Sequence, residues 1–142
     1  MPKEYYDPTN QRDGLEAASE REGRNLTFEE SVITHPSHLD GLVDKGDACL
    51  VGDTIVGIAE TDAIAATDPI AIDTEAVRYK NVIANGNMNR GAVVYIDPIT
   101  AVLSDDAGDV PFGYILSPLT ASQTPQLVGV KVHAHFLGVL ST

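Results

Sequence analysis

The 142-residue sequence contains one cysteine, no tryptophan and only nine lysine or arginine residues. The single cysteine, Cys49, excludes a disulfide within the chain. Twenty-one acidic residues give a formal net charge of −12, which argues against a nucleic-acid partner because phosphate binding requires clustered basic side chains. The same balance disfavours an anionic membrane surface, and no apolar run is long enough to span a bilayer.

The sequence also lacks the short motifs of common enzyme classes. It contains no Gly-x-Ser-x-Gly elbow, no phosphate-binding glycine-rich loop, no His-Glu-x-x-His helix and no paired cysteines. Its first residues do not follow the basic-then-apolar pattern of a signal peptide. We therefore expect a protein that is not an enzyme, binds no cofactor and is made in a cytoplasm.

The sequence does contain an internal repeat. Residues 46–51 (GDACLV) align with residues 91–96 (GAVVYI), and Cys49 falls on Val94, which indicates a small buried side chain rather than a reactive thiol. Further equivalences share an offset of 56 residues: 55–57 with 111–113, Ala65 with Ala121, and Pro69 with Pro125. Such repetition indicates one small unit used twice, and we expect the two copies to share a core.

From residue 32 onward, short apolar runs alternate with Gly, Pro, Asp and Asn, as in β proteins. Predicted strands cover residues 47–51, 54–60, 70–73, 76–84, 92–97, 100–103, 112–117 and 127–137. The last of these alternates polar and apolar residues, so one of its faces is expected to be exposed. The predicted fold is all-β, a small β-barrel or β-tulip-like sandwich built from two pseudo-repeats over residues 32–142.

Residues 1–31 differ from the rest in composition, being rich in Asp, Glu, Arg, Asn and Gly. A segment this polar cannot bury enough surface to offset its ordering entropy when it is free, so it is predicted to form an extended N-terminal arm. Its bulky apolar residues are spaced like anchors for a neighbouring subunit. These are Tyr5, Tyr6, Leu15, Leu26 and Phe28.

Four histidines offer a metal site as an alternative. His133 and His135 project from the same face of a predicted strand, and His35 with His38 could complete a set of imidazole ligands. Exposed strand histidines without a carboxylate motif are commoner than ligands. No metal site is therefore predicted.

A second possible cation site is the long hairpin that distinguishes the second repeat. It carries Asp97, Asp105, Asp106 and Asp109, whose spacing matches no EF-hand loop. Paired-carboxylate catalysis would require burial and a cleft to separate the two pKa values, which a turn rich in Gly and Asp does not offer. The favoured interpretation is a solvated loop tip.

Three segments together resemble a known family. Residues 57–63 (GIAETDA), 70–77 (IAIDTEAV) and 91–97 (GAVVYID) have the order and spacing of strands in capsid decoration, or cement, proteins of tailed viruses, lambda-type in role. The resemblance covers residues 32–136, and Ala76 stands where relatives often have Gly. It implies a structural virion protein that binds the major capsid protein on the outer head surface as a homotrimer and stabilises the expanded lattice.

The resemblance also implies that residues 1–31 contact the capsid, since decoration proteins commonly order such an arm only there. Two other classes remain open. One is a different virion component, such as a turret, a spike or a tail adaptor, which copy number per particle would distinguish. The other is a small trimeric β-fold nucleotide hydrolase, which a hydrolysis assay would reveal.

Overall fold

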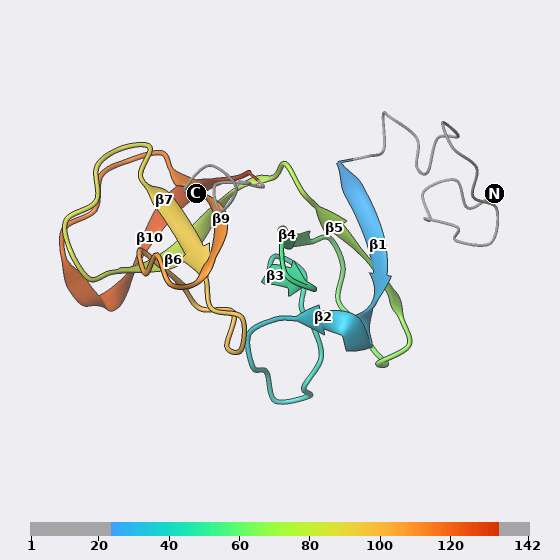
Figure 1. The fold of residues 1–142 in the computed structure, drawn as a ribbon. Helices are drawn as coiled ribbons and strands as arrows, with labels where there is room; N and C mark the ends of the chain where they lie inside the picture. Colours follow the sequence, from blue (N-terminus) through green and yellow to red (C-terminus); the bar gives the residue numbers. More distant parts are fainter. Residues whose placement is uncertain (1–23, 134–142) are drawn as a thin grey trace.

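The computed structural model describes residues 24–133, and its strands form two units that lie side by side (Figure 1). The sheet unit is a five-stranded antiparallel sheet in the order β1-β5-β4-β3-β2, and the barrel unit is a closed barrel in the order β10-β6-β8-β7-β9. The predicted all-β class with a barrel is confirmed. No helix among the described residues is long and apolar enough to cross a membrane.

Most strand bounds lie close to the predicted segments, but β10 begins at Ser122 and ends at Val132 where a strand over 127–137 was predicted. The sheet unit contains β1 (Asn25–Glu29), β2 (Ile33–Thr34), β3 (Ala48–Val51), β4 (Ile55–Ala59) and β5 (Pro69–Asp73), with the 3₁₀ helix η2 (Glu30–Val32) joining β1 to β2. The barrel unit contains β6 (Val77–Ala84), β7 (Val93–Ile96), β8 (Leu103–Ser104), β9 (Val110–Ile115) and β10 (Ser122–Val132).

Two differences from the predicted strands have local causes. The segment predicted as a strand over 100–103 is mostly a turn, because Ala101 has a left-handed φ of 60° and only Leu103 enters β8. Strands β1 and β2 were not predicted, because their residues lie in or beside the polar N-terminal segment and gain their pairing from β5 and β3.

The internal repeat recurs in three dimensions as the strand trios β3-β4-β5 and β7-β9-β10. Cys49 pairs with Gly57 across β3 and β4, and their aligned counterparts Val94 and Gly113 pair across β7 and β9. The aligned residues therefore occupy equivalent places in the two units.

Hydrogen bonds at the start of each trio are also duplicated. The Gly46 amide donates to the Ala59 carbonyl at 2.8 Å, and the aligned Gly91 amide donates to the Ile115 carbonyl at 2.8 Å. Both glycines have left-handed φ angles, 91° and 85°, which a side chain would disfavour. Each copy thus uses a glycine to turn the chain into its first repeat strand.

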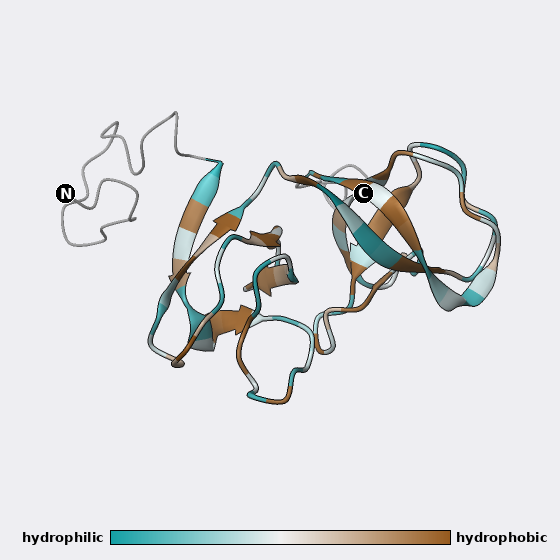
Figure 2. Cartoon of the chain, turned by 180° about the vertical axis from the view of Figure 1, so that it is seen from behind, coloured by the Kyte–Doolittle hydropathy of each residue, from teal (hydrophilic) through white to brown (hydrophobic). Residues whose placement is uncertain are grey.

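The larger apolar core is shared between the two units, as the repeat predicted. Leu50 and Ile58 of the sheet pack in one cluster with Val94, Phe112 and Val130 of the barrel. Because residues alternate along a strand, the opposite face of the sheet builds a second cluster. That cluster contains Ile33, Val43, Cys49, Val51, Ala59, Ala63, Ile70 and Ile72. Burial on both faces explains the apolar runs of β3 and β4, brown at the centre of the sheet in Figure 2.

Two cations on β6 join the barrel to the sheet. The Lys80 ammonium donates to the Gly46 carbonyl at 2.7 Å, and the Arg78 guanidinium lies 3.5 Å from the Glu60 carboxylate. Burial lowers the pKa of Lys80, since a charged ammonium loses hydration at this junction. Both basic side chains are therefore directed at the sheet unit.

Candidate interaction surfaces

The predicted arm residues divide into two groups. Tyr5, Tyr6 and Leu15 lie outside the described residues. Leu26 and Phe28 lie in β1 at an edge of the sheet, where both are half-buried. Phe28 packs against the second cluster, so it belongs in part to the folded body.

Strand β1 changes the predicted boundary between arm and body. The arm was predicted to extend to residue 31, whereas residues 25–29 pair with β5 from Asn25 opposite Asp73 to Glu29 opposite Pro69. Only two of the five β1 residues are bulky and apolar, which is why composition placed them in the arm. The sheet unit therefore begins before residue 31.

Arg24 fixes the start of β1. Its guanidinium forms two hydrogen bonds with the buried Asp73 carboxylate, at 2.8 and 3.1 Å. Its carbonyl accepts hydrogen bonds from the Thr74 amide at 2.6 Å and from the Thr74 hydroxyl at 2.8 Å. Burial alone would raise the pKa of Asp73, but hydrogen bonds from Arg24 and the Glu75 amide lower it below its usual value.

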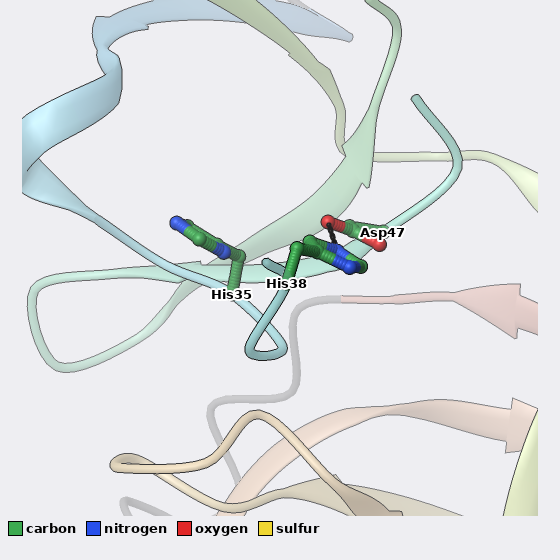
Figure 3. A group of neighbouring side chains, drawn as sticks. All are labelled: His35, His38 and Asp47. Carbon is green, nitrogen blue, oxygen red and sulfur yellow. Dashed lines mark hydrogen bonds and ion pairs between the residues drawn. The ribbon is translucent and has the colours of Figure 1, made fainter. Parts of the chain in front are cut away.

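The loop between β2 and β3 brings His35, His38 and Asp47 together, with one potential ligand atom of each within 4.8 Å of the others (Figure 3). His38 Nε2 lies 2.7 Å from Asp47 Oδ2. His35 Nε2 lies 2.8 Å from Glu30 Oε2, and its Nδ1 lies 2.7 Å from the Pro36 carbonyl. The two histidines were paired as possible ligands from the sequence, but neither carboxylate was predicted, since Glu30 comes from η2 and Asp47 from the residue before β3.

This group has the geometry of a braced loop. Both nitrogens of His35 and Nε2 of His38 already have hydrogen-bond partners, and Figure 3 shows the two rings extending in opposite directions from the loop. The Glu30 carboxylate, which is buried, also accepts the Val43 amide at 3.1 Å and is thereby satisfied. The hydrogen bond to Asp47 raises the pKa of His38. Three of the four ring nitrogens therefore already serve the hydrogen bonds of the loop.

Of the other two histidines considered as possible ligands, only His133 is among the described residues, and it does not belong to this group. His133 follows β10 and forms an edge-to-face contact with Tyr114, with ring centroids 6.3 Å apart, and His135 lies outside the described residues. Within residues 24–133, His35, His38 and Asp47 are the only potential metal-ligand group of this kind.

The aspartates of the long hairpin mainly shape turns. Asp97 Oδ1 accepts the amides of residues 99 and 100 at 2.8 and 3.0 Å, which lowers the pKa of Asp97. Asp105 accepts the amides of residues 85 and 86, and Asp106 accepts that of residue 108. Burial, followed by the nearby charges of Asp97 and Asp106, raises the pKa of Asp109. Three of the four carboxylates thus act as turn acceptors.

One open hollow of about 530 Å³ lies beside this hairpin. It is lined by residues 87–93 together with Tyr95, Asp105 and Ala107. The lining contains no histidine, cysteine or serine. Its single carboxylate, Asp105, is already engaged by the turn at residues 85–86. The hollow therefore lacks a paired acid and base.

The outer face of the barrel carries an apolar patch on β6, β10 and the end of β9. We call Val77, Tyr79, Leu116 and Leu127 the β6–β10 patch, in which Tyr79 and Leu127 are 78% and 66% exposed. Tyr79 lies directly across from Gly129, and the Leu116 side chain covers the same glycine from the other side. The alternation of β10 had predicted one exposed face, but not that this face would be apolar.

Charge is distributed unequally between the two units. Residues 24–76, the sheet unit, contain eleven acidic and two basic residues, a formal net charge of −9. Residues 77–133, the barrel unit, contain four of each, a net charge of zero. The acidity of the described chain thus belongs to the sheet unit.

Comparison with known proteins gives one match. A family model described as phage cement protein matches residues 28–132, from Phe28 in β1 to the last residue of β10. The match therefore covers both units and the strand β1. Neither the curated proteins nor the solved structures give a match.

Proposed function

Because the chain belongs to the phage cement protein family, we propose that it binds the outer surface of a tailed-virus head as a homotrimer and stabilises the expanded lattice. The observation that carries this proposal is the family match across both units. A cement protein that binds the expanded lattice and not a loosened one stabilises the shell by mass action, and each occupied site adds free energy. Its partner would be the major capsid protein.

The groups in the described residues fit a binding role better than a catalytic one. Burial raises the pKa of the Cys49 thiol to about 12, so it is not a nucleophile at neutral pH. His38 is held by Asp47 in the braced loop, away from the open hollow near residues 87–93. We therefore propose that the protein acts through its surfaces and has no enzymatic activity.

We further propose that the N-terminal segment supplies capsid contacts. Tyr5, Tyr6 and Leu15 would be buried against the shell, because a polar segment with spaced apolar anchors can order on binding. Leu26 and Phe28 would contribute only the parts of their side chains that β1 leaves exposed. The contact region would therefore continue from the arm onto an edge of the sheet.

The test uses particles that lack the protein, with binding measured by co-sedimentation and shell stability by the temperature of genome release. We expect the full chain to saturate many equivalent sites and to raise the release temperature. A variant that begins at Arg24 should keep its β spectrum and bind far more weakly. The control variant Glu4→Gln/Glu20→Gln/Glu22→Gln should bind like the wild type, because contact area and not charge is lost in the truncation.

Two results would contradict the proposal. Binding of only a few copies at one vertex or at the tail would indicate an adaptor or spike. Unchanged affinity of the truncated chain would show that residues 1–23 make no capsid contact that matters.

A further inference from the structure

We propose that the β6–β10 patch is the surface through which copies of this chain associate with one another. The patch lies on β6, on β10 and on Leu116, the residue that follows β9. Gly129 leaves the centre of its face without a side chain, and Tyr79 and Leu116 flank this position. Leu127 extends the patch along β10, opposite the exposed and uncharged Asn81.

The composition of the patch is that of an interface core. Aromatic and aliphatic side chains surrounded by polar groups are typical of buried interface centres, whereas charged residues are depleted there. Tyr79 offers a large contact area with few rotatable bonds and a hydroxyl group for a hydrogen bond. A monomer would leave this tyrosine and Leu127 in water.

One of the four basic side chains of the barrel, Lys131, lies on the outer face of the barrel, directly across from Val77. Arg78 and Lys80 are directed at the sheet unit. Lys131 Nζ donates to the carbonyl groups of Glu75 and Val132 at 3.0 and 3.1 Å. Arg90 Nε donates to the Leu116 carbonyl at 3.0 Å. These hydrogen bonds hold Lys131 and Arg90 along the backbone but leave both side chains charged, so the patch has an apolar centre and a basic margin.

The charge distribution identifies the partner as a second copy. Two chains with net charges of −12 repel each other, and most of that repulsion comes from sheet units that carry −9 each. Identical chains can approach closely only through the neutral barrel, and the exposed apolar residues of the barrel strands form the patch. A basic partner would instead be attracted to the sheet unit.

This inference deepens the proposed function, because it rests on the proposed trimer and assigns a surface to it. A capsid subunit, or residues 134–142 of the same chain, are the competing occupants of the patch. Occupation of the patch by either of them would depend on salt and on protein concentration differently from binding of a second copy. Self-association of the isolated chain is measured without particles, so its failure can be distinguished from failure of capsid binding.

The first experiment is sedimentation of the full chain over a concentration series. We expect association at micromolar concentration that strengthens between about 20 mM and about 500 mM NaCl, since salt screens repulsion between the sheet units. Leu127→Glu should weaken association at least about tenfold, because it places a negative charge from each copy at the apolar contact. The control Ile64→Glu adds the same charge at a still more exposed position on the sheet unit and should have no such effect.

The second experiment measures protection of an added thiol. Asn81→Cys lies beside the patch, and Thr54→Cys lies on the exposed turn between β3 and β4. Native Cys49 is buried and does not compete for the reagent. Labelling of Asn81→Cys should slow as protein concentration rises, while labelling of Thr54→Cys should not.

Three results would overturn the inference. The first is a full chain that stays monomeric at every concentration and salt. The second is Leu127→Glu that associates like the wild type. The third is slow, concentration-independent labelling of Asn81→Cys that becomes fast when residues 134–142 are removed, which would show that the chain covers its own patch. Particle binding by the wild type decides the proposed function separately.

Discussion

Replacing Gly57 or Gly113 by alanine should destabilise the protein, because the third strand of each repeat packs directly against these aligned glycines. A Cβ at Gly57 would overlap Cγ2 of Ile72 and lie 2.8 Å from the Asp73 carbonyl oxygen. A Cβ at Gly113 would overlap the Lys131 carbonyl oxygen and lie 3.0 Å from its carbonyl carbon. Neither glycine has a left-handed φ, so the expected effect is steric.

The two substitutions should differ in magnitude. Overpacking in a core typically costs about 1 to 3 kcal/mol. At Gly57 one of the two closest obstacles, the Ile72 methyl, is side chain rather than backbone, so we expect about 2 kcal/mol. At Gly113 every close atom belongs to the backbone, and only a shift of β10 relieves the overlap, so we expect about 3 kcal/mol or more.

Thermal and urea unfolding of the two variants measure this difference. At about 3 °C per kcal/mol for a chain of this size, the midpoint should fall by about 6 °C for Gly57→Ala and by about 9 °C or more for Gly113→Ala. Gly86→Ala is the matched control, since a Cβ there meets no atom within 4 Å. A Gly113→Ala variant as stable as this control would refute the close approach of β9 and β10.

Two further predictions concern charged groups. Arg24→Ala should lower stability at neutral pH, by less than the loss of a fully buried pair because the Arg24 side chain is half exposed, and Arg24→Lys should restore part of it. Because folding lowers the pKa of Asp73, the ion pair stabilises the protein fully above pH about 4, and this stabilisation is lost as the pH falls through the folded pKa. The urea midpoints of Arg24→Ala and of the wild type should therefore converge in acid. For His38, whose folded pKa is raised, the stabilisation is present below pH about 6.5 and is lost as pH rises through the folded pKa. The urea midpoint of the wild type should therefore fall between acid and mildly alkaline pH, and His38→Gln should remove this fall. If the variant shows the same fall, another titrating group causes it.

Much of the fold was predictable because local sequence carries the relevant signals. Alternation, β-branched residues and turn dipeptides located the barrel strands, and the alignment of Cys49 with Val94 anticipated two residues in equivalent buried positions. Strand β1 could not be located in this way. Its pairing partner β5 lies more than 40 residues away, and its own five residues are mostly polar.

The candidate surfaces were less predictable for the same reason. The sequence placed His35 and His38 close together, but the hydrogen bonds with Glu30 and Asp47 depend on how η2 and β3 fold around the loop. The β6–β10 patch arises only when Leu116 of one strand end lies over Gly129 of another. Such contacts depend on register between distant strands, which composition does not encode.

The attachment of β1 also has a mechanical consequence. If residues 1–23 tether the protein to a shell under internal pressure, tension along them reaches the folded body at Arg24. This tension acts first on the ion pair with Asp73 and on the two hydrogen bonds from Thr74, and only then on the strand pairing between β1 and β5. Asp73 and Thr74 lie where β5 leads into β6, so force would pass from the tether into the segment that connects the two units. The sheet interior would carry little of this force, and the tether could be strained without opening the second cluster.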